Sequence, residues 1–153
     1  MKIVLDGMDR LLVDTNVLVY AYDPRDRLKQ DVASALLREL VLSERAVVSA
    51  QCLSEFFSVV TTRLPEPLTR SEARVRVDGI ASSAAVLDVT DAVVSEGCRG
   101  SAEHGLSIWD ALIWSAARLN QVRYVLTEDA PHGRRLEGVT FLDPFDPSFV
   151  LPE

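Results

Sequence analysis

The stretch LLVDTNVLVYAYD, residues 11–23, decides how the N-terminal half of the chain folds. Its apolar start ends at Asp14, a pattern typical of a short strand that is buried on both faces. Residues 10–14 are therefore predicted to form a strand with Asp14 at its carboxyl end. The residues from Thr15 to about Tyr22 can then turn into a short helix.

Helix-like and strand-like segments alternate through the rest of the chain. Thr69 and Glu72 have capping-box spacing, whereas Gly97 and Gly100 weaken the end of one predicted helix. The chain after Pro144 is expected to be a surface tail. This order predicts an α/β fold with a mainly parallel sheet of about five strands. The predicted helices span residues 28–42, 50–64, 69–82, 90–104 and 107–120, and the further strands span residues 46–49, 85–88, 123–127 and 139–142.

The length of 153 residues suits a single domain, 1–153, with a core at about residues 9–145. No apolar run approaches the roughly 18–20 residues that a membrane span needs. The start of the chain is too short and too acidic for a signal peptide, and either Met1 or Met8 could be the first residue. We therefore expect a cytoplasmic protein without membrane contact.

The net charge of −7 is unusual for a protein that binds nucleic acid, because phosphate contacts normally need a basic face. Acidic side chains that hold a divalent cation would inflate the negative count and still present positive charge to a phosphate. Local basic groups occur at Arg25, Arg27, Lys29, Arg134 and Arg135. Each of these is more often a solvated surface residue than a phosphate contact.

The cysteines and histidines predict neither a disulfide nor a zinc site. Cys52 and Cys98 lie in helix-like segments without a C-x-x-C pair, and reduced cysteines are the ordinary case in the cytoplasm. His104 and His132 have no second His or Cys at ligand spacing.

Polar residues at the carboxyl ends of strands are the candidates for chemistry, because open parallel sheets bind ligands at that edge. Asp14 ends the first predicted strand, and Thr127 and Asp129 follow the fourth. Glu55 lies a turn into the helix after the second strand, and Asp110 lies in the first turn of the last predicted helix. Helix first turns can point toward the same edge of the sheet.

Each acid also has a structural explanation when it is taken singly. Asp14 could cap a helix, Asp110 could favour a helix dipole, Asp129 could be a turn residue and Glu55 a solvated helix residue. Together they indicate a site, because Asp14 and Asp110 are embedded in the apolar stretches LLVDTNVLVY and LSIWDALIW. Solitary acids are rarely buried unless they are paired or bound to metal.

Carboxylates that converge repel one another, and some would hold protons unless a cation joined them. A hard divalent ion such as Mg²⁺ or Mn²⁺ suits carboxylate and water oxygens. The chemistry that follows is metal-assisted phosphodiester hydrolysis, in which one or two ions activate a water and neutralise charge on the leaving oxygen.

Four stretches that carry these acids resemble the motifs of the PIN-domain family, and most closely its VapC toxins, which belong to bacterial VapBC toxin–antitoxin pairs. Any one of them is a weak signal, but four in order over nearly the whole chain are a strong one. Pro131, within the last motif, departs from the family pattern and stiffens the loop that bears Asp129. The stretches are residues 11–23, 49–60 (SAQCLSEFFSVV), 106–117 (LSIWDALIWSAA) and 124–133 (YVLTEDAPHG), and residues 139–145 (VTFLDPF) are similar to the closing strand.

The resemblance implies a PIN-like three-layer α/β/α fold and a Mg²⁺-dependent endoribonuclease, with Mn²⁺ able to substitute. It implies the toxin component of a type II toxin–antitoxin pair, often a homodimer, whose partners are an RNA substrate and a cognate VapB-like antitoxin. It further implies catalytic roles for Asp14, Glu55, Asp110 and Asp129, with Asp14, Asp110 and Asp129 as metal ligands, and supporting hydrogen bonds from Asn16 and Thr127. An antitoxin arginine among the carboxylates is expected on electrostatic grounds.

Other functions stay open at this point. A phosphatase of the haloacid-dehalogenase type needs a second acid where this chain has Asn16. A phospho-accepting receiver domain could use Asp88 but needs a lysine near its fifth strand, and no lysine follows Lys29. A PIN-fold nuclease without a toxin role and a non-catalytic module that binds RNA or a partner are the remaining alternatives.

Overall fold

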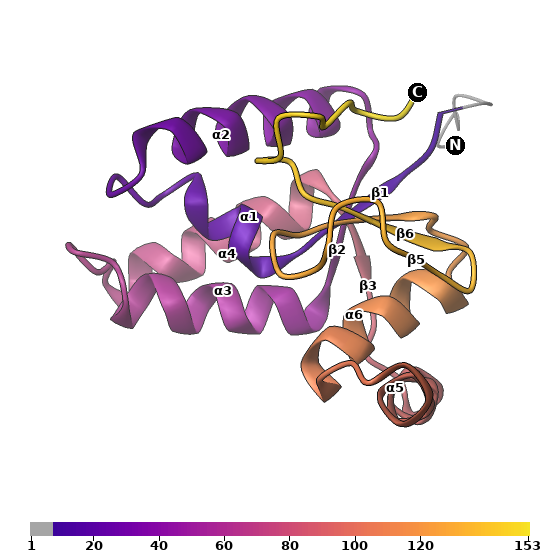
Figure 1. Ribbon diagram of the computed structural model, residues 1–153. Coiled ribbons are helices and arrows are strands. Elements are labelled where there is room, and N and C mark those ends of the chain that lie inside the picture. The colour runs from indigo at the N-terminus through magenta and orange to yellow at the C-terminus, as the bar shows by residue number, and fades with distance from the viewer. Residues whose placement is uncertain (1–7) are drawn as a thin grey trace.

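A mainly parallel sheet forms the centre of the molecule in the computed structural model, which describes residues 8–153 (Figure 1). Its strands lie in the order β3-β2-β1-β4-β6-β5, and only β5 runs antiparallel to its neighbour. The strands are β1 (Leu11–Val13), β2 (Ala46–Ser49), β3 (Ala85–Leu87), β4 (Tyr124–Leu126), β5 (Arg135–Leu136) and β6 (Val139–Leu142).

Helices cover both faces of this sheet and give a three-layer α/β/α arrangement, as the sequence predicted (Figure 1). One face is covered by α1 (Thr15–Tyr20), α2 (Arg27–Leu42), α3 (Ala50–Thr62) and α4 (Arg70–Ser83). The other face is covered by α5 (Asp91–His104) and α6 (Ile108–Leu119), which pack against each other.

Polar side chains start the helices at the expected places, because each satisfies a backbone N–H that the first turn leaves without a partner. Ser49 accepts a hydrogen bond from the Cys52 N–H at the start of α3, and Ser107 accepts one from the Asp110 N–H at the start of α6. Thr69 and Glu72 form both hydrogen bonds of a capping box at α4. These caps fix where α3 and α6, the helices that carry Glu55 and Asp110, begin.

The core lies on both sides of β1, whose three residues are fully buried. Phe56 of α3 and Trp114 of α6 are the largest buried side chains, and each lies close in sequence to a candidate acid. Burial of a large apolar side chain contributes about 1.5–3 kcal/mol. Glu55 and Asp110 are therefore carried by helices that the core holds firmly against the sheet.

The sheet has six strands rather than the predicted five or so, because β5 adds a strand at one edge that has no local sequence pattern. Arg135 and Leu136 form a two-residue strand that pairs antiparallel with β6 through Thr140 and Val139. Two residues are too short for an alternating pattern, so the strand exists only through its tertiary partner.

The chain after Pro144 is not a surface tail, which corrects the prediction. Phe145, Phe149 and Leu151 pack against the core. The carbonyl of Pro152 accepts a hydrogen bond from the buried Arg45 side chain, and the carbonyl of Glu153 accepts one from the Asp9 N–H at 3.2 Å. The end of the chain therefore closes over the start of β1.

Two glycines that weakened the predicted helix at residues 90–104 lie within α5 without ending it. A Cβ atom at Gly100 would lie 2.5 Å from the Trp114 ring, and one at Gly97 would lie 3.1 Å from Leu112. The two helices pack so closely here that Gly100 has no room for a side chain. Packing against α6 thus outweighs the poor helix propensity of glycine.

Within residues 8–153, no helix has both the length and the apolar character that crossing a membrane requires. The prediction about a signal peptide and the choice between Met1 and Met8 fall in part on residues 1–7, which lie outside the described range.

Candidate metal centre

Three predicted acids meet at the carboxyl edge of the sheet. Asp14 directly follows β1, Asp129 lies in the loop after β4, and Asp110 lies in the first turn of α6. One carboxylate oxygen from each lies within 4.8 Å of those from the other two. We call these three residues the carboxylate trio.

The sheet topology explains how residues so distant in sequence meet. Strands β1 and β4 are parallel neighbours with Val13 opposite Leu126, so the residues that follow them leave the sheet side by side. The Asp14 N–H donates a hydrogen bond to the Leu126 carbonyl at 2.9 Å. Gly105, in the left-handed conformation with φ of 70°, ends α5 and turns the chain into α6, which brings Asp110 to the same edge.

The Thr127 hydroxyl joins two members of the trio. It donates to Asp14 Oδ2 at 2.8 Å and accepts from the Asp129 N–H and from Asn16 Nδ2, each at 3.1 Å. A hydroxyl offers one donor and two acceptor positions, so Thr127 is fully used. The two residues predicted to support the acids, Asn16 and Thr127, are therefore both in contact with this hydrogen-bond network.

Asn16 contributes a second feature through its amide oxygen. Asn16 Oδ1 is buried and has no hydrogen-bond partner among residues 8–153, while its Nδ2 is held by Thr127. A buried acceptor without a partner is costly and usually has a functional reason. Asn16 lines the same hollow as Asp14, so this oxygen is a further hard acceptor available there.

Glu55 lies in the same hollow as the trio but belongs to a separate hydrogen-bonded group. Its Oε2 accepts from the Thr15 hydroxyl at 2.9 Å, and its Oε1 accepts from Gln51 Nε2 at 3.0 Å. Asp14, Glu55, Asp110 and Asp129 all line this hollow, whose volume is about 730 Å³. The four acids predicted from the sequence thus share one hollow, with Glu55 outside the closest group.

The electrostatics of the trio disfavour three negative charges. The pKa of Asp14 is raised to about 6, chiefly by burial and additionally by the Asp129 and Asp110 carboxylates, against the lowering effect of the hydrogen bonds from Thr127 and Thr15. Burial also raises the pKa of Asp110, with additional repulsion from Asp129 and Glu55. Among residues 8–153, no basic side chain forms an ion pair with the trio.

The nearby basic residues are mostly occupied elsewhere. Arg25 pairs with Asp23 at 2.7 Å, and Lys29 pairs with Glu128 at 2.8 Å. Arg134 lines a small cavity of about 170 Å³ beside the trio but lies beyond ion-pair distance from it. The positive charge that three close carboxylates need is therefore not supplied by these side chains.

This donor set fits a hard divalent cation. The trio offers three carboxylate oxygens and Asn16 adds an amide oxygen, all of the type that Mg²⁺ and Mn²⁺ prefer. Cys52 Sγ lies 4.0 Å from Asp14 Oδ1, but burial and the Asp14 charge raise the pKa of this thiol to about 11, so it stays protonated. Asp14, Asp110 and Asp129 are the residues that would hold the ion.

Two residues that line this hollow were not singled out from the sequence. Trp109 precedes Asp110 and is 62% exposed, and Arg63 caps the end of α3. Trp109 falls outside the apolar face of α6, which contains Ala111, Leu112 and Ser115. That mismatch between a large aromatic residue and an exposed helix position was the available signal.

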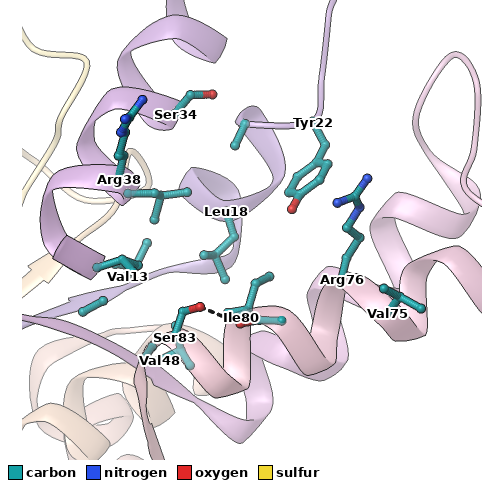
Figure 2. A pocket seen from close by; sticks show the side chains of 16 residues that line it. Val13, Leu18, Tyr22, Ser34, Arg38, Val48, Val75, Arg76, Ile80 and Ser83 are labelled. Carbon is teal, nitrogen blue, oxygen red and sulfur yellow. Dashed lines mark hydrogen bonds between the residues drawn. The ribbon is translucent and has the colours of Figure 1, made fainter. Parts of the chain in front are cut away.

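A second hollow, the α2–α4 groove, lies between two helices on the other side of α1 and contains no carboxylate (Figure 2). Arg38 of α2 and Arg76 of α4 lie on its two sides, and Leu18 lies between them. Its volume is about 640 Å³ and its lining is mainly apolar: Val13, Leu18, Ala21, Tyr22, Leu37, Val41, Val48, Val75 and Ile80 are among the lining residues. This groove lacks the donors for metal chemistry and is suited to an apolar partner surface.

Comparison with known families identifies the chain. The model of the PIN domain family matches residues 11–134, which include all four candidate acids. The chain belongs to the PIN domain family. No match was found among curated proteins.

Solved structures share the fold of this PIN domain at low sequence identity. A toxin–antitoxin complex from Klebsiella pneumoniae has a chain with 16% identity and a TM-score of 0.66, over 89% of this chain and 98% of that one. A chain of DNA-bound VapBC from Salmonella typhimurium has 18% identity and a TM-score of 0.65, over 90% of this chain and 99% of that one. VapC20 from Mycobacterium tuberculosis, a toxin that cleaves the sarcin–ricin loop, has 18% identity and a TM-score of 0.59, over 75% of this chain and 86% of that one.

Proposed function

We propose that this PIN domain is a Mg²⁺-dependent endoribonuclease, with Mn²⁺ able to substitute, and the toxin of a VapBC-type pair. The observation that carries the proposal is the carboxylate trio, in which three oxygens lie within 4.8 Å without a basic partner among residues 8–153. Membership of the PIN family and the toxin–antitoxin origin of the similar structures support it. We further propose that residues 1–153 form a single domain and that the protein acts in the cytoplasm, where it would meet an RNA substrate.

Each residue of the site has a specific task in this proposal. Asp14, Asp110 and Asp129 hold the divalent ion, which when bound would lower the pKa of a water and stabilise charge on the phosphate. Thr127 keeps Asp14 ionised and oriented by donating a hydrogen bond to it. Asn16 Oδ1 is available to orient the attacking water, and Glu55 completes the pocket and can accept its proton.

The test of this function is cleavage of an RNA pool by the purified protein in Mg²⁺, in Mn²⁺ and in a chelator. We expect cleavage in either ion, none in the chelator, and none by Asp14→Asn under any condition. Mapping the new RNA ends would identify the target. Equal cleavage by wild type and Asp14→Asn would contradict the proposal.

A VapB-like antitoxin is the proposed partner, with a contact at each hollow. An arginine of the antitoxin among the carboxylates would neutralise the trio, because a planar guanidinium matches paired carboxylates. An amphipathic helix of the same antitoxin would fill the α2–α4 groove, where Arg38 and Arg76 on its sides favour acidic flanking residues. Val75→Asp at this groove, where Val75 is 67% exposed, should weaken co-purification with the antitoxin and leave cleavage unchanged.

A homodimer is part of the proposal, and sedimentation of the purified chain would test it.

The toxin role is tested separately from the nuclease. Strong expression of the chain alone should stop growth, whereas Asp14→Asn should not. Cleavage without growth arrest would indicate a PIN nuclease with no toxin role, and the absence of both cleavage and divalent-ion binding would indicate a non-catalytic module.

A further inference from the structure

Trp109 stands out among the residues beside the trio because it is a large aromatic side chain left in solvent. It is 62% exposed, whereas Trp114, the other tryptophan, is fully buried in the core. Trp109 lines the same hollow as Asp14, Glu55 and Asp129, and it directly precedes Asp110. An exposed aromatic residue at the wall of a site is a common recognition element.

The backbone that carries Trp109 is held in place from the opposite helix. Gln51 Nε2 of α3 donates to the Trp109 carbonyl at 3.2 Å and to Glu55 Oε1 at 3.0 Å. Within residues 8–153 the indole N–H of Trp109 makes no hydrogen bond, whereas that of Trp114 donates to the Leu136 carbonyl at 3.2 Å. The backbone of Trp109 is therefore fixed relative to the acids while its ring remains free to accept a ligand.

The hollow extends from Trp109 past the acids and along α3 to a free cation. Ser58, Val59 and Arg63 continue its lining. Arg63 is exposed and forms no ion pair within residues 8–153, unlike Arg25, which is paired with Asp23. Arg63 lies eight residues beyond Glu55, which corresponds to roughly 12 Å along a helix.

We infer that Trp109 stacks on an unpaired base of the RNA next to the cleaved phosphate, and that Arg63 contacts a phosphate farther along the same strand. This inference rests on the proposed nuclease function and assigns two residues outside the trio to RNA binding. An aromatic platform beside a cationic track is the usual way to hold single-stranded nucleic acid, because every base offers a ring face. A base within a duplex is stacked on its neighbours and cannot offer that face.

The matched substitutions are Trp109→Ala, which removes the ring, and Trp109→Phe, which keeps an aromatic face. Both are made in the Asp110→Asn background so that binding is measured without cleavage. The probe is a short labelled RNA of mixed sequence, single-stranded or annealed to its complement, and binding is followed by fluorescence anisotropy. Arg63→Gln is measured at several salt concentrations.

Single-stranded RNA should bind at least tenfold more weakly to Trp109→Ala than to the parent, and Trp109→Phe should recover most of that loss. The duplex should bind weakly to all of them. Arg63→Gln should weaken binding at low salt and reduce the salt dependence by about one phosphate contact. RNA should also quench the intrinsic fluorescence of the parent, and Trp114→Phe should retain that quenching.

Equal RNA affinity for Trp109→Ala and its parent would overturn the inference, and so would duplex binding as tight as single-strand binding. If Trp109→Ala lost binding to the antitoxin alone, the ring would belong to the protein interface and the inference would be wrong. These results leave the nuclease untouched, because Mg²⁺-dependent cleavage by the wild type is scored separately. Failure of the wild type to cleave any RNA would instead remove the proposed function.

Discussion

Two acidic clusters within residues 8–153 have the spacing of metal ligands, yet their electrostatics are opposite. The carboxylate trio groups Asp14, Asp110 and Asp129, and a second group of Glu103, His104 and Glu137 also brings three ligand atoms within 4.8 Å of one another. The second group lies where α5 ends beside the turn between β5 and β6.

The second cluster already contains its cation. Arg99 donates to Glu103 at 2.7 Å and to Glu137 at 2.9 Å, and it also contacts Glu96. The pKa of Glu137 is lowered by His104 and by Arg99, and the pKa of Glu96 is lowered by Arg99. We call these five residues the Arg99 network.

The difference teaches that spacing alone does not identify a metal centre. In the trio the pKa values of Asp14 and Asp110 are raised, because burial and repulsion act without a compensating charge. In the Arg99 network Glu96 and Glu137 are stabilised in their charged form by the protein itself. Carboxylates whose repulsion is left unrelieved are the ones prepared for an external cation.

The largest expected difference between the clusters is in catalysis. Asp110→Asn should lower the rate of RNA cleavage by at least about 100-fold, because loss of a group that stabilises transition-state charge costs that much or more. Glu137→Gln, the matched change in the Arg99 network, should leave the rate within about twofold of the wild type. Single-turnover cleavage of one RNA substrate measures both. Similar losses in the two variants would break the distinction.

Thr127→Val should have a smaller effect, about tenfold in rate at neutral pH, because it removes one hydrogen bond to a charged group. Since the Thr127 hydrogen bond lowers the pKa of Asp14, its loss should raise that pKa further above about 6. The acidic limb of the pH–rate profile should therefore move to higher pH. Thr127→Ser keeps the hydroxyl and should restore the wild-type profile, and an unmoved profile in Thr127→Val would argue against this role.

Divalent ions should stabilise the fold through the trio alone. At a Mg²⁺ concentration about 100 times the dissociation constant, the free energy of unfolding should rise by about 2.7 kcal/mol. Asp110→Asn should abolish this rise, whereas the double variant Glu103→Gln, Glu137→Gln should keep it. Thermal unfolding with and without Mg²⁺ is the measurement. If the Glu103 and Glu137 variant lost the stabilisation by Mg²⁺, the ion would bind at the Arg99 network and the prediction would be wrong.

The last prediction is a pH dependence of stability in the presence of a chelator, which involves Asp14 alone. The pKa of Asp14 is raised from 3.8 to about 6 on folding, so between these pH values the folded state holds more protons than the unfolded state. The contribution of Asp14 to stability must then fall as the pH rises from about 4 to above 6. The difference in unfolding free energy between wild type and Asp14→Asn, measured in urea across this range, should follow that fall. A difference that rises with pH would contradict the burial argument.

Most of the fold could be predicted because apolar periodicity is a local property. Strands β2 and β6 have the predicted bounds, and the remaining predicted helices and strands differ by one or two residues at their ends. The two residues of β5 and the contacts of Phe149 and Leu151 depend on partners distant in the chain. No local pattern carries that information.

The site was predictable to the extent that its residues directly follow strands, because parallel sheets bind ligands at the carboxyl ends of their strands. Asp14, Thr127 and Asp129 follow parallel strands, so their proximity follows from the sheet order. The positions of Asp110 and Glu55 required an assumption about helix orientation that the structure supports. The position of Trp109 off the apolar face of α6 indicated exposure, but its place in the hollow of the acids could not be predicted, because it depends on how α6 packs against the sheet and α5.

The most direct test of the difference between the clusters is anomalous diffraction from crystals of the protein soaked in Mn²⁺. We predict a Mn²⁺ peak bound by Asp14, Asp110 and Asp129, and no peak at Glu103, His104 and Glu137. A peak at the Arg99 network, or an empty trio at a Mn²⁺ concentration that supports cleavage, would contradict the account.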